Sequence, residues 1–287
     1  VLLSLRSLCR RLKRTMRGRG HGPAPRGRAV SSVGRAPRLH RGCREFEPLT
    51  AHHSLSLRAG GPALQNTAPQ NPALQDMALQ NKVTPFGDIV AIRARCDLMG
   101  NRGILHDADK TLRPARWKHK HWVTCRLSFG GRKREVMALG KYTELFFLDE
   151  AVALAAGHRP CGECRHADLK RFLMCWRNAH GGELPRSGDI DRILHKARVH
   201  SRSREQIRYM APIDDLPNGS FVRAYDGDTA LLVCSGSLLP YSPGGYGKPR
   251  PRPSNIEVEV LTPRPTVETL KAGYVPVLHA SAGANNG

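Results

Sequence analysis

Hydrophobic and polar positions alternate along several short stretches of the chain, and this alternation predicts β-strands. The longest stretch is residues 122–129, WVTCRLSF, in which strong β-formers recur with a period of two. Gly130-Gly131 follows and can form a two-residue turn, because glycine adopts positive φ at little cost. Residues 136–139 are then expected to return as the partner strand. Further strands are predicted at residues 89–96, 145–148, 220–224, 230–234 and 256–260.

Other stretches have the spacing of amphipathic helices. Asp149 is a good N-cap for a short helix, and Gly157 can take the left-handed conformation that ends one. Helices are predicted at residues 150–156, 166–179, 187–199 and 266–272. The inner faces of the two longer helices are expected to carry Leu169, Phe172, Leu173, Trp176, Ile190, Ile193, Leu194 and Ala197.

Strands and helices are segregated along the chain instead of alternating, which predicts an α+β fold. We expect a small strand/helix module at residues 77–182, a helical connector at 183–211 and a β-rich C-terminal module at 212–287.

The first 76 residues differ from the rest in composition. Residues 1–80 contain 14 Lys and Arg and three acidic residues, so they carry half of the formal net charge of +22. Arg-rich, acid-poor openings occur in transit peptides and in arms that bind nucleic acid. A degenerate five-residue repeat at residues 62–81, PALQN-TAPQN-PALQD-MALQN, has too little apolar content for a core. We expect residues 1–76 to be disordered.

Part of this segment, within residues 30–53, resembles the conceptual translation of a transfer-RNA gene. Residues 31–36 (SSVGRA) match what the D-arm encodes in one frame, and residues 45–48 (EFEP) match what the T-arm encodes further along. The two elements occur in the order and at the distance that a tRNA gene requires. The resemblance implies that residues 1–76 are a non-native extension and that the working protein begins near Met77. The alternative is a functional basic tail.

The composition limits the classes of protein to which this chain can belong. The chain has 287 residues, 40% of them hydrophobic, and eight cysteines. The longest apolar run, near residues 145–156, is interrupted by Asp149 and Glu150, whereas a transmembrane helix needs about 20 apolar residues in a row. An integral membrane protein is therefore excluded. We expect a cytoplasmic protein, in which disulfides are disfavoured.

Two cysteines have the spacing of metal ligands. Cys161 and Cys164 form a C-x2-C within HRPCGECR, a tight turn that lets both thiolates reach one tetrahedral ion. A redox dithiol shares this spacing, but the preceding βαβ pattern of a thioredoxin-like motif is absent. The spacing favours zinc.

The surrounding residues 146–165, FFLDEAVALAAGHRPCGECR, resemble the second half of the metal-binding module of Ada-type DNA repair proteins. In that family, and in related zinc modules that follow nuclease-like domains, a strand leads to a short helix with EA and AG, an aromatic residue and RPC-x-x-C. Cys161 and Cys164 match the second ligand pair, whereas His158 replaces the aromatic residue. The resemblance implies a zinc-stabilised module with a link to DNA repair.

The first ligand pair is less clearly matched. The Ada family uses two cysteines there, one of which accepts a methyl group, and the chain has no matching pair upstream, so methyl transfer is not implied. The related modules use a His and a Cys after a strand, and His106 is the counterpart of that His. Cys125 is our choice for the fourth ligand, with His158 and His166 as alternates.

Basic and aromatic residues cluster between residues 113 and 134, a stretch without an acidic residue. Cations that contact phosphates beside aromatic rings that stack on bases are typical of nucleic-acid-binding surfaces, although a solvated basic hairpin would have the same composition. The predicted contacts, including two arginines that flank the C-x2-C, are Arg116, Trp117, Lys118, Lys120, Trp122, Arg132, Lys133, Arg134, Arg159 and Arg165.

These features together predict a cytosolic bacterial protein that binds zinc and contacts DNA or RNA, with a structural metal. One rival is a zinc-dependent or DNA-modifying enzyme that uses His106 and Asp107. Three protein ligands and a bound water would favour this enzyme. Asp107 and Asp109 are equally consistent with an ordinary turn. A third possibility is a protein-interaction module, which would be indifferent to nucleic acid.

Overall fold

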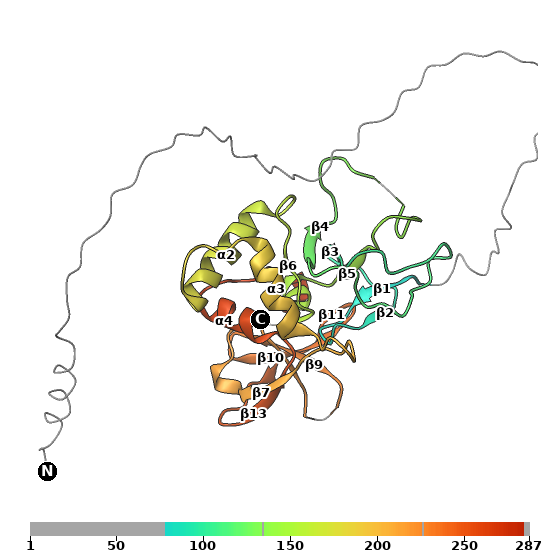
Figure 1. Ribbon diagram of the computed structural model, residues 1–287. Helices are drawn as coiled ribbons and strands as arrows, with labels where there is room; N and C mark the ends of the chain where they lie inside the picture. Colours follow the sequence, from blue (N-terminus) through green and yellow to red (C-terminus); the bar gives the residue numbers. More distant parts are fainter. Residues whose placement is uncertain (1–77, 134, 226, 284–287) are drawn as a thin grey trace, which may run out of the picture. The chain divides into compact units, whose positions relative to one another are not determined.

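The computed structural model describes residues 78–133, 135–225 and 227–283, which belong to one compact unit, Asn66–Gly287 (Figure 1). The predictions of disorder and of a non-native extension at residues 1–76 lie outside the described residues. Two sheets and four α-helices make up the described part of the chain, which confirms a mixed α+β architecture. None of its helices has the length and apolar character needed to cross a bilayer.

The first sheet has six strands in the order β2-β1-β5-β3-β4-β6. Its inner strand β5 runs parallel to β1 and antiparallel to β3, and β4 lies between β3 and β6. The strands are β1 (Gln80–Val83), β2 (Ile89–Ala91), β3 (Leu98–Asn101), β4 (Val123–Arg126), β5 (Leu145–Phe147) and β6 (Arg159–Pro160).

The predicted hairpin after residue 122 does not form. Strand β4 ends at Arg126, and its two partners are β3 and β6. Both of its edges are therefore occupied, and no edge is left for residues 136–139 to pair with. Those residues form turns, although Gly130 and Gly131 have the expected positive φ of 61° and 67°. The strand predicted at residues 89–96 is also shorter than expected, since β2 ends at Ala91.

Helix α1 (Glu150–Ala155) forms the centre of the unit, and all six of its residues are buried. The Asp149 carboxylate accepts a hydrogen bond from the Val152 N–H, as expected of an N-cap. Gly157 follows the helix with φ of 82°. The predictions of this helix and its caps are confirmed.

Three more helices, α2 (His166–His180), α3 (Ser187–Arg198) and α4 (Arg264–Lys271), gather beside the sheets (Figure 1). They close a core of Leu154, Phe172, Trp176, Ile190, Leu194, Leu270 and Tyr274. The predicted ranges for α2 and α3 agree with the structure to within one residue. Ile193 was expected to face inward but is 48% exposed.

The second sheet has seven strands, in the order β11-β10-β9-β8-β13-β7, with β12 paired to β10. Its strands are β7 (Tyr209–Pro212), β8 (Phe221–Arg223), β9 (Ala230–Cys234), β10 (Ser237–Ser242), β11 (Gly245–Tyr246), β12 (Arg250–Pro251) and β13 (Glu257–Val260). Two 3-10 turns, η2 (Ile213–Asp215) and η3 (Ala280–Ala282), complete this half.

The two predicted modules share one hydrophobic core. A single cluster joins Phe147 of β5 and Val152 of α1 to Phe221, Leu232 and Leu239 of the second sheet. Helix α1 has no exposed face because side chains from both sheets cover it. The C-terminal half therefore packs directly on the half that carries the cysteines.

Candidate metal centre

Three cysteine thiols meet at one end of the first sheet. Cys125 lies on β4, Cys161 directly follows β6, and Cys164 lies in the turn before α2. The parallel pairing of β4 and β6, extended by a 2.9 Å hydrogen bond from the Cys161 N–H to the Thr124 carbonyl, brings residue 161 beside residue 125. The three Sγ atoms lie within 4.8 Å of one another.

This arrangement suits a tetrahedral metal ion with thiolate ligands. Zinc–sulfur bonds of about 2.3 Å place tetrahedral ligands about 3.8 Å apart, so small side-chain movements bring all three sulfurs to one ion. Backbone N–H groups point at two of them: Glu163 donates to the Cys161 Sγ and Arg126 to the Cys164 Sγ, each at 3.4 Å. Such donors stabilise thiolate charge in metal sites. The three cysteines can hold a metal ion.

The thiols differ in acidity. A hydrogen bond from the Cys125 thiol, working against burial and helped by the N–H groups of Cys164 and Glu163, lowers the pKa of Cys161 to about 5. The same hydrogen bond and burial raise the pKa of Cys125, and burial raises that of Cys164. Because the thiolate is the form that binds metal, the lowered pKa of Cys161 favours metal binding at this residue.

The structure does not bring His106 to this group. His106 is buried, and its ring nitrogens lie 2.6 Å from the Thr143 hydroxyl and 3.3 Å from the Ala138 carbonyl. Neither alternate belongs to the group: the His158 Nε2 accepts a hydrogen bond from Arg102, and His166 is exposed at the start of α2. Of the four predicted ligands, three cluster and the histidine serves the local fold.

Asp107 also has a local role. Its carboxylate accepts hydrogen bonds from the N–H groups of Asp109 and Thr111. This is the side-chain-to-backbone pattern of an Asx turn, so the turn interpretation of this stretch fits the structure.

Five of the predicted nucleic-acid contacts are exposed cations: Arg116, Lys118, Lys120, Arg132 and Lys133. Arg132 pairs with Glu163, one of the two residues between the cysteines of the C-x2-C, at 2.5 Å. The cations near residue 132 therefore lie beside the candidate metal centre. Arg134 lies outside the described residues.

Arg159 and Arg165 are not available to phosphates, and we remove both from the predicted contacts. Arg159 is 5% exposed and makes two hydrogen bonds to the buried Asp191 carboxylate, at 2.8 and 2.7 Å. Arg165 is 3% exposed and pairs with Glu150 at 2.7 Å. Both arginines hold structural elements together.

Trp122 is also unavailable for stacking on a base. Its side chain is 1% exposed, and the guanidinium carbons of Arg198 and Arg102 lie 3.8 and 4.1 Å from the ring. The ring centroid of Trp117 lies 5.9 Å from that of Trp122, and Trp117 is only half-buried. Arg102 and Arg198 are not among the predicted site residues, because nothing in their local sequence marks them as neighbours of this tryptophan.

In comparisons with known proteins, no family model, no curated protein and no solved structure matches this chain. The resemblance to the Ada-type module therefore remains a prediction.

Proposed function

We propose that this chain is a zinc-binding protein that contacts nucleic acid through the exposed cations beside its metal centre. The observation that carries the proposal is the meeting of Cys125, Cys161 and Cys164. Three thiols donate to zinc in preference to magnesium or calcium, which take oxygen ligands. The Ada-type resemblance adds a role in DNA repair to this proposal.

The metal has a structural purpose at this position. Cys125 belongs to the sheet, whereas Cys161 and Cys164 belong to the turn that enters α2. One ion bound by all three would join the sheet to the helix, and structural zinc sites in small modules contribute directly to folding free energy.

The nucleic-acid part of the proposal rests on charge and exposure. Arg126, Arg132 and Lys133 are exposed and belong to the segment that leaves the metal centre. Glu163 is the one acidic partner that pairs with any of the three among the described residues. A metal-fixed loop with surplus cations suits a phosphate backbone.

The test measures zinc content and nucleic-acid binding of the same full-length protein. We expect one zinc per chain and binding to duplex or single-stranded probes that weakens steeply with salt. Reversing Arg132 and Lys133 together to Glu is expected to reduce the log–log salt slope by about 1.8 for duplex, since each phosphate contact contributes about 0.9.

The matched control reverses two exposed lysines elsewhere, Lys248 and Lys271, and so changes net charge equally. The slope of this control is expected to stay near that of the parent protein. An equal reduction of the salt slope in both variants would contradict the nucleic-acid proposal and favour the protein-interaction alternative. The absence of salt-sensitive binding by the zinc-loaded parent protein would do the same.

The number of ligands supports a second candidate, a zinc-dependent or DNA-modifying enzyme. Among residues 78–133, 135–225 and 227–283, the group contains three thiols, and a zinc ion with three protein ligands keeps a position for water. X-ray absorption at the zinc edge separates the two candidates. Three sulfurs with one oxygen of exchangeable water favour the enzyme, whereas a complete set of protein ligands favours the structural centre.

A further inference from the structure

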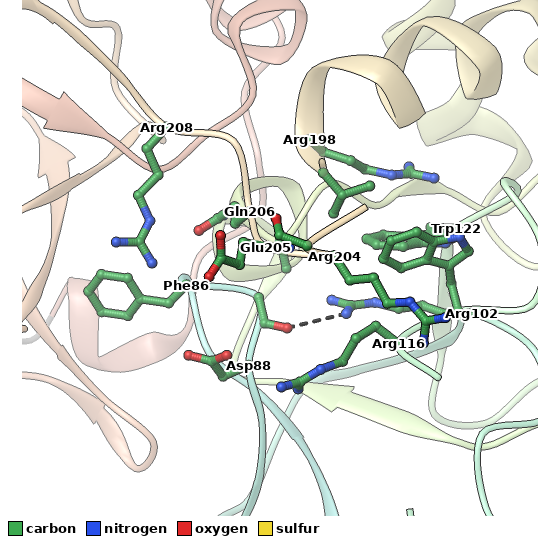
Figure 2. Close-up of a pocket in the computed structure, with 15 residues that line it drawn as sticks. Phe86, Asp88, Arg102, Arg116, Trp122, Arg198, Arg204, Glu205, Gln206 and Arg208 are labelled. Carbon is green, nitrogen blue, oxygen red and sulfur yellow. Dashed lines mark hydrogen bonds between the residues drawn. The ribbon is translucent and has the colours of Figure 1, made fainter. Parts of the chain in front are cut away.

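A cavity of about 320 Å³ opens beside Trp122, and its walls are strongly basic (Figure 2). Five arginines line it: Arg102, Arg116, Arg198, Arg204 and Arg208. Two acidic residues, Asp88 and Glu205, also lie in the wall. No carboxylate within the described part of the chain forms an ion pair with Arg102, Arg116 or Arg198. Arg208 pairs with Glu259 at 3.6 Å, and the cavity keeps a net positive charge.

Arg102 is the most informative of these residues. It is 3% exposed, and two of its nitrogens are engaged: Nη1 donates to the Gly87 carbonyl at 3.2 Å and Nε donates to His158 at 3.4 Å. Its third nitrogen, Nη2, is buried and has no hydrogen-bond partner among the residues that the structure describes. Buried polar groups nearly always have partners, so this donor calls for an acceptor supplied from the cavity.

Arg198 adds a second buried cation with a fixed position. Its Nη1 and Nη2 donate to the carbonyls of Gly157 and Lys120 at 2.6 and 2.8 Å. The ring of Trp122 lies between the guanidinium groups of Arg198 and Arg102 (Figure 2). The protein thus holds two like charges on opposite sides of one aromatic ring. Stacking on the ring stabilises each cation only partly.

The histidine next to them adds no further positive charge. Burial, together with the charges of Arg102 and Arg198, lowers the pKa of His158 well below its usual value, so His158 is neutral at physiological pH. Burying unpaired charge is costly. An anion in the cavity would offset that cost by facing Arg102 directly and Arg116 from the exposed side.

We propose that this cavity binds the phosphate group of a nucleotide, with Arg102 and Arg116 as its ligands. Guanidinium groups match the tetrahedral oxygens of phosphate and donate to two of them at once. The cavity is larger than one phosphate and falls in the size range of small-molecule sites. The side chains of Trp117 and Phe86 also line it and provide apolar surface for a base.

The phosphate has two possible sources with the same chemistry, a free nucleotide and the 5′-terminal phosphate of a strand. The inference goes beyond the proposed function, because the cavity arginines are different residues from Arg132 and Lys133. Either proposal can therefore fail without the other.

The experiment is calorimetric titration of the full-length protein with adenosine monophosphate, adenosine, inorganic phosphate and a tetranucleotide with or without a 5′-phosphate. We expect saturable binding of the monophosphate, competition by inorganic phosphate and no binding of adenosine. Monophosphate binding assigns the site to free nucleotides, whereas binding of the 5′-phosphorylated tetranucleotide alone assigns it to strand ends.

The variants test the residues. Arg116→Ala is expected to weaken binding of the favoured probe about tenfold or more, as loss of a charge-assisted hydrogen bond does. Arg113→Ala is the matched control, because Arg113 is exposed three residues away and does not line the cavity. Arg102→Gln is expected to weaken binding further. If this variant fails to fold, Arg116→Ala carries the test.

Three results would overturn the proposal: no saturable binding of any phosphate-containing probe, adenosine binding as tightly as its monophosphate, or unchanged binding by Arg116→Ala and folded Arg102→Gln. The Arg132→Glu, Lys133→Glu double variant is expected to keep monophosphate binding. If monophosphate binds but no probe shows salt-sensitive nucleic-acid binding, the proposed function is wrong and the cavity proposal stands.

Discussion

Arg165 and Glu150 form a buried ion pair, with 2.7 Å between a guanidinium nitrogen and a carboxylate oxygen. Arg165 directly follows Cys164, and Glu150 is the first residue of the central helix α1. The Glu150 carboxylate also accepts hydrogen bonds from the Tyr274 hydroxyl at 2.6 Å and the Val277 N–H at 3.0 Å. One carboxylate therefore connects the cysteine turn, the central helix and the C-terminal segment.

Breaking this pair is expected to destabilise the whole unit. Arg165→Met leaves the Glu150 charge buried and unpaired, which costs about 3–5 kcal/mol of unfolding free energy. The control is Arg171→Met, since Arg171 pairs with Asp168 at the exposed surface, where such pairs contribute about 0–1 kcal/mol. Urea unfolding measures the loss of unfolding free energy in both variants. Equal losses would show that burial of the Arg165 pair has no special importance.

Each of the three clustered cysteines is expected to be necessary for metal binding. Replacement of Cys125, Cys161 or Cys164 with Ser should abolish stoichiometric zinc, because a hydroxyl is a poor substitute for thiolate. Cys175→Ser, on helix α2, is the control and should keep one zinc per chain. Elemental analysis of the purified proteins measures the zinc content of each variant. Retention of zinc by Cys125→Ser would remove residue 125 from the centre.

Gly157 is expected to tolerate no side chain. At its φ of 82° an added Cβ would lie 2.5 Å from the Cδ of Arg198, so Gly157→Ala combines backbone strain with displacement of that arginine. Gly181→Ala isolates the strain, because Gly181 has a φ of 74° and no heavy atom within 4 Å of its Cβ position. Strain alone costs about 1–2 kcal/mol. Urea unfolding should show a larger loss for Gly157→Ala than for the control.

Stability is expected to fall on mild acidification. Burial, followed by the charges of Arg198 and Lys120, lowers the pKa of His195 to about 4, whereas an unfolded histidine titrates near 6.5. Between these values the unfolded state binds the extra proton, so the unfolding free energy decreases as the pH falls from about 6.5 to 4. His195→Gln should flatten this decrease, measured by urea unfolding at each pH.

A residual slope is expected in that variant, because the pKa of His158 is lowered as well. Parallel pH profiles for His195→Gln and the parent protein would contradict the assignment to residue 195.

The local elements were predictable because their information is local. The N-cap at Asp149 and the glycine at 157 define helix α1, and the apolar spacing of Phe172 and Trp176 defines the inner face of α2. The C-x2-C spacing was sufficient to single out Cys161 and Cys164, and alternation on one strand suggested Cys125. These patterns depend on neighbours a few residues apart, where chain geometry determines which side chains meet.

Pairing between distant segments was not predictable in the same way. The glycine pair after β4 suggested a hairpin, but β3 and β6 occupy both edges of that strand. Local turn chemistry only permits a hairpin. The competition between possible partner strands is decided by the burial of the whole sheet.

Which charged side chains are buried and which stay exposed depended most of all on the tertiary structure. By sequence alone, Arg159 and Arg165, which flank the C-x2-C, and Arg132, in the basic segment, are equivalent candidates for phosphate contacts. Folding buries the first two against Asp191 and Glu150 and leaves Arg132 at the surface. It also brings Arg102 and Arg198 to the two sides of Trp122. The sequence determines which charges exist, whereas their burial and partners depend on contacts between residues far apart in the chain.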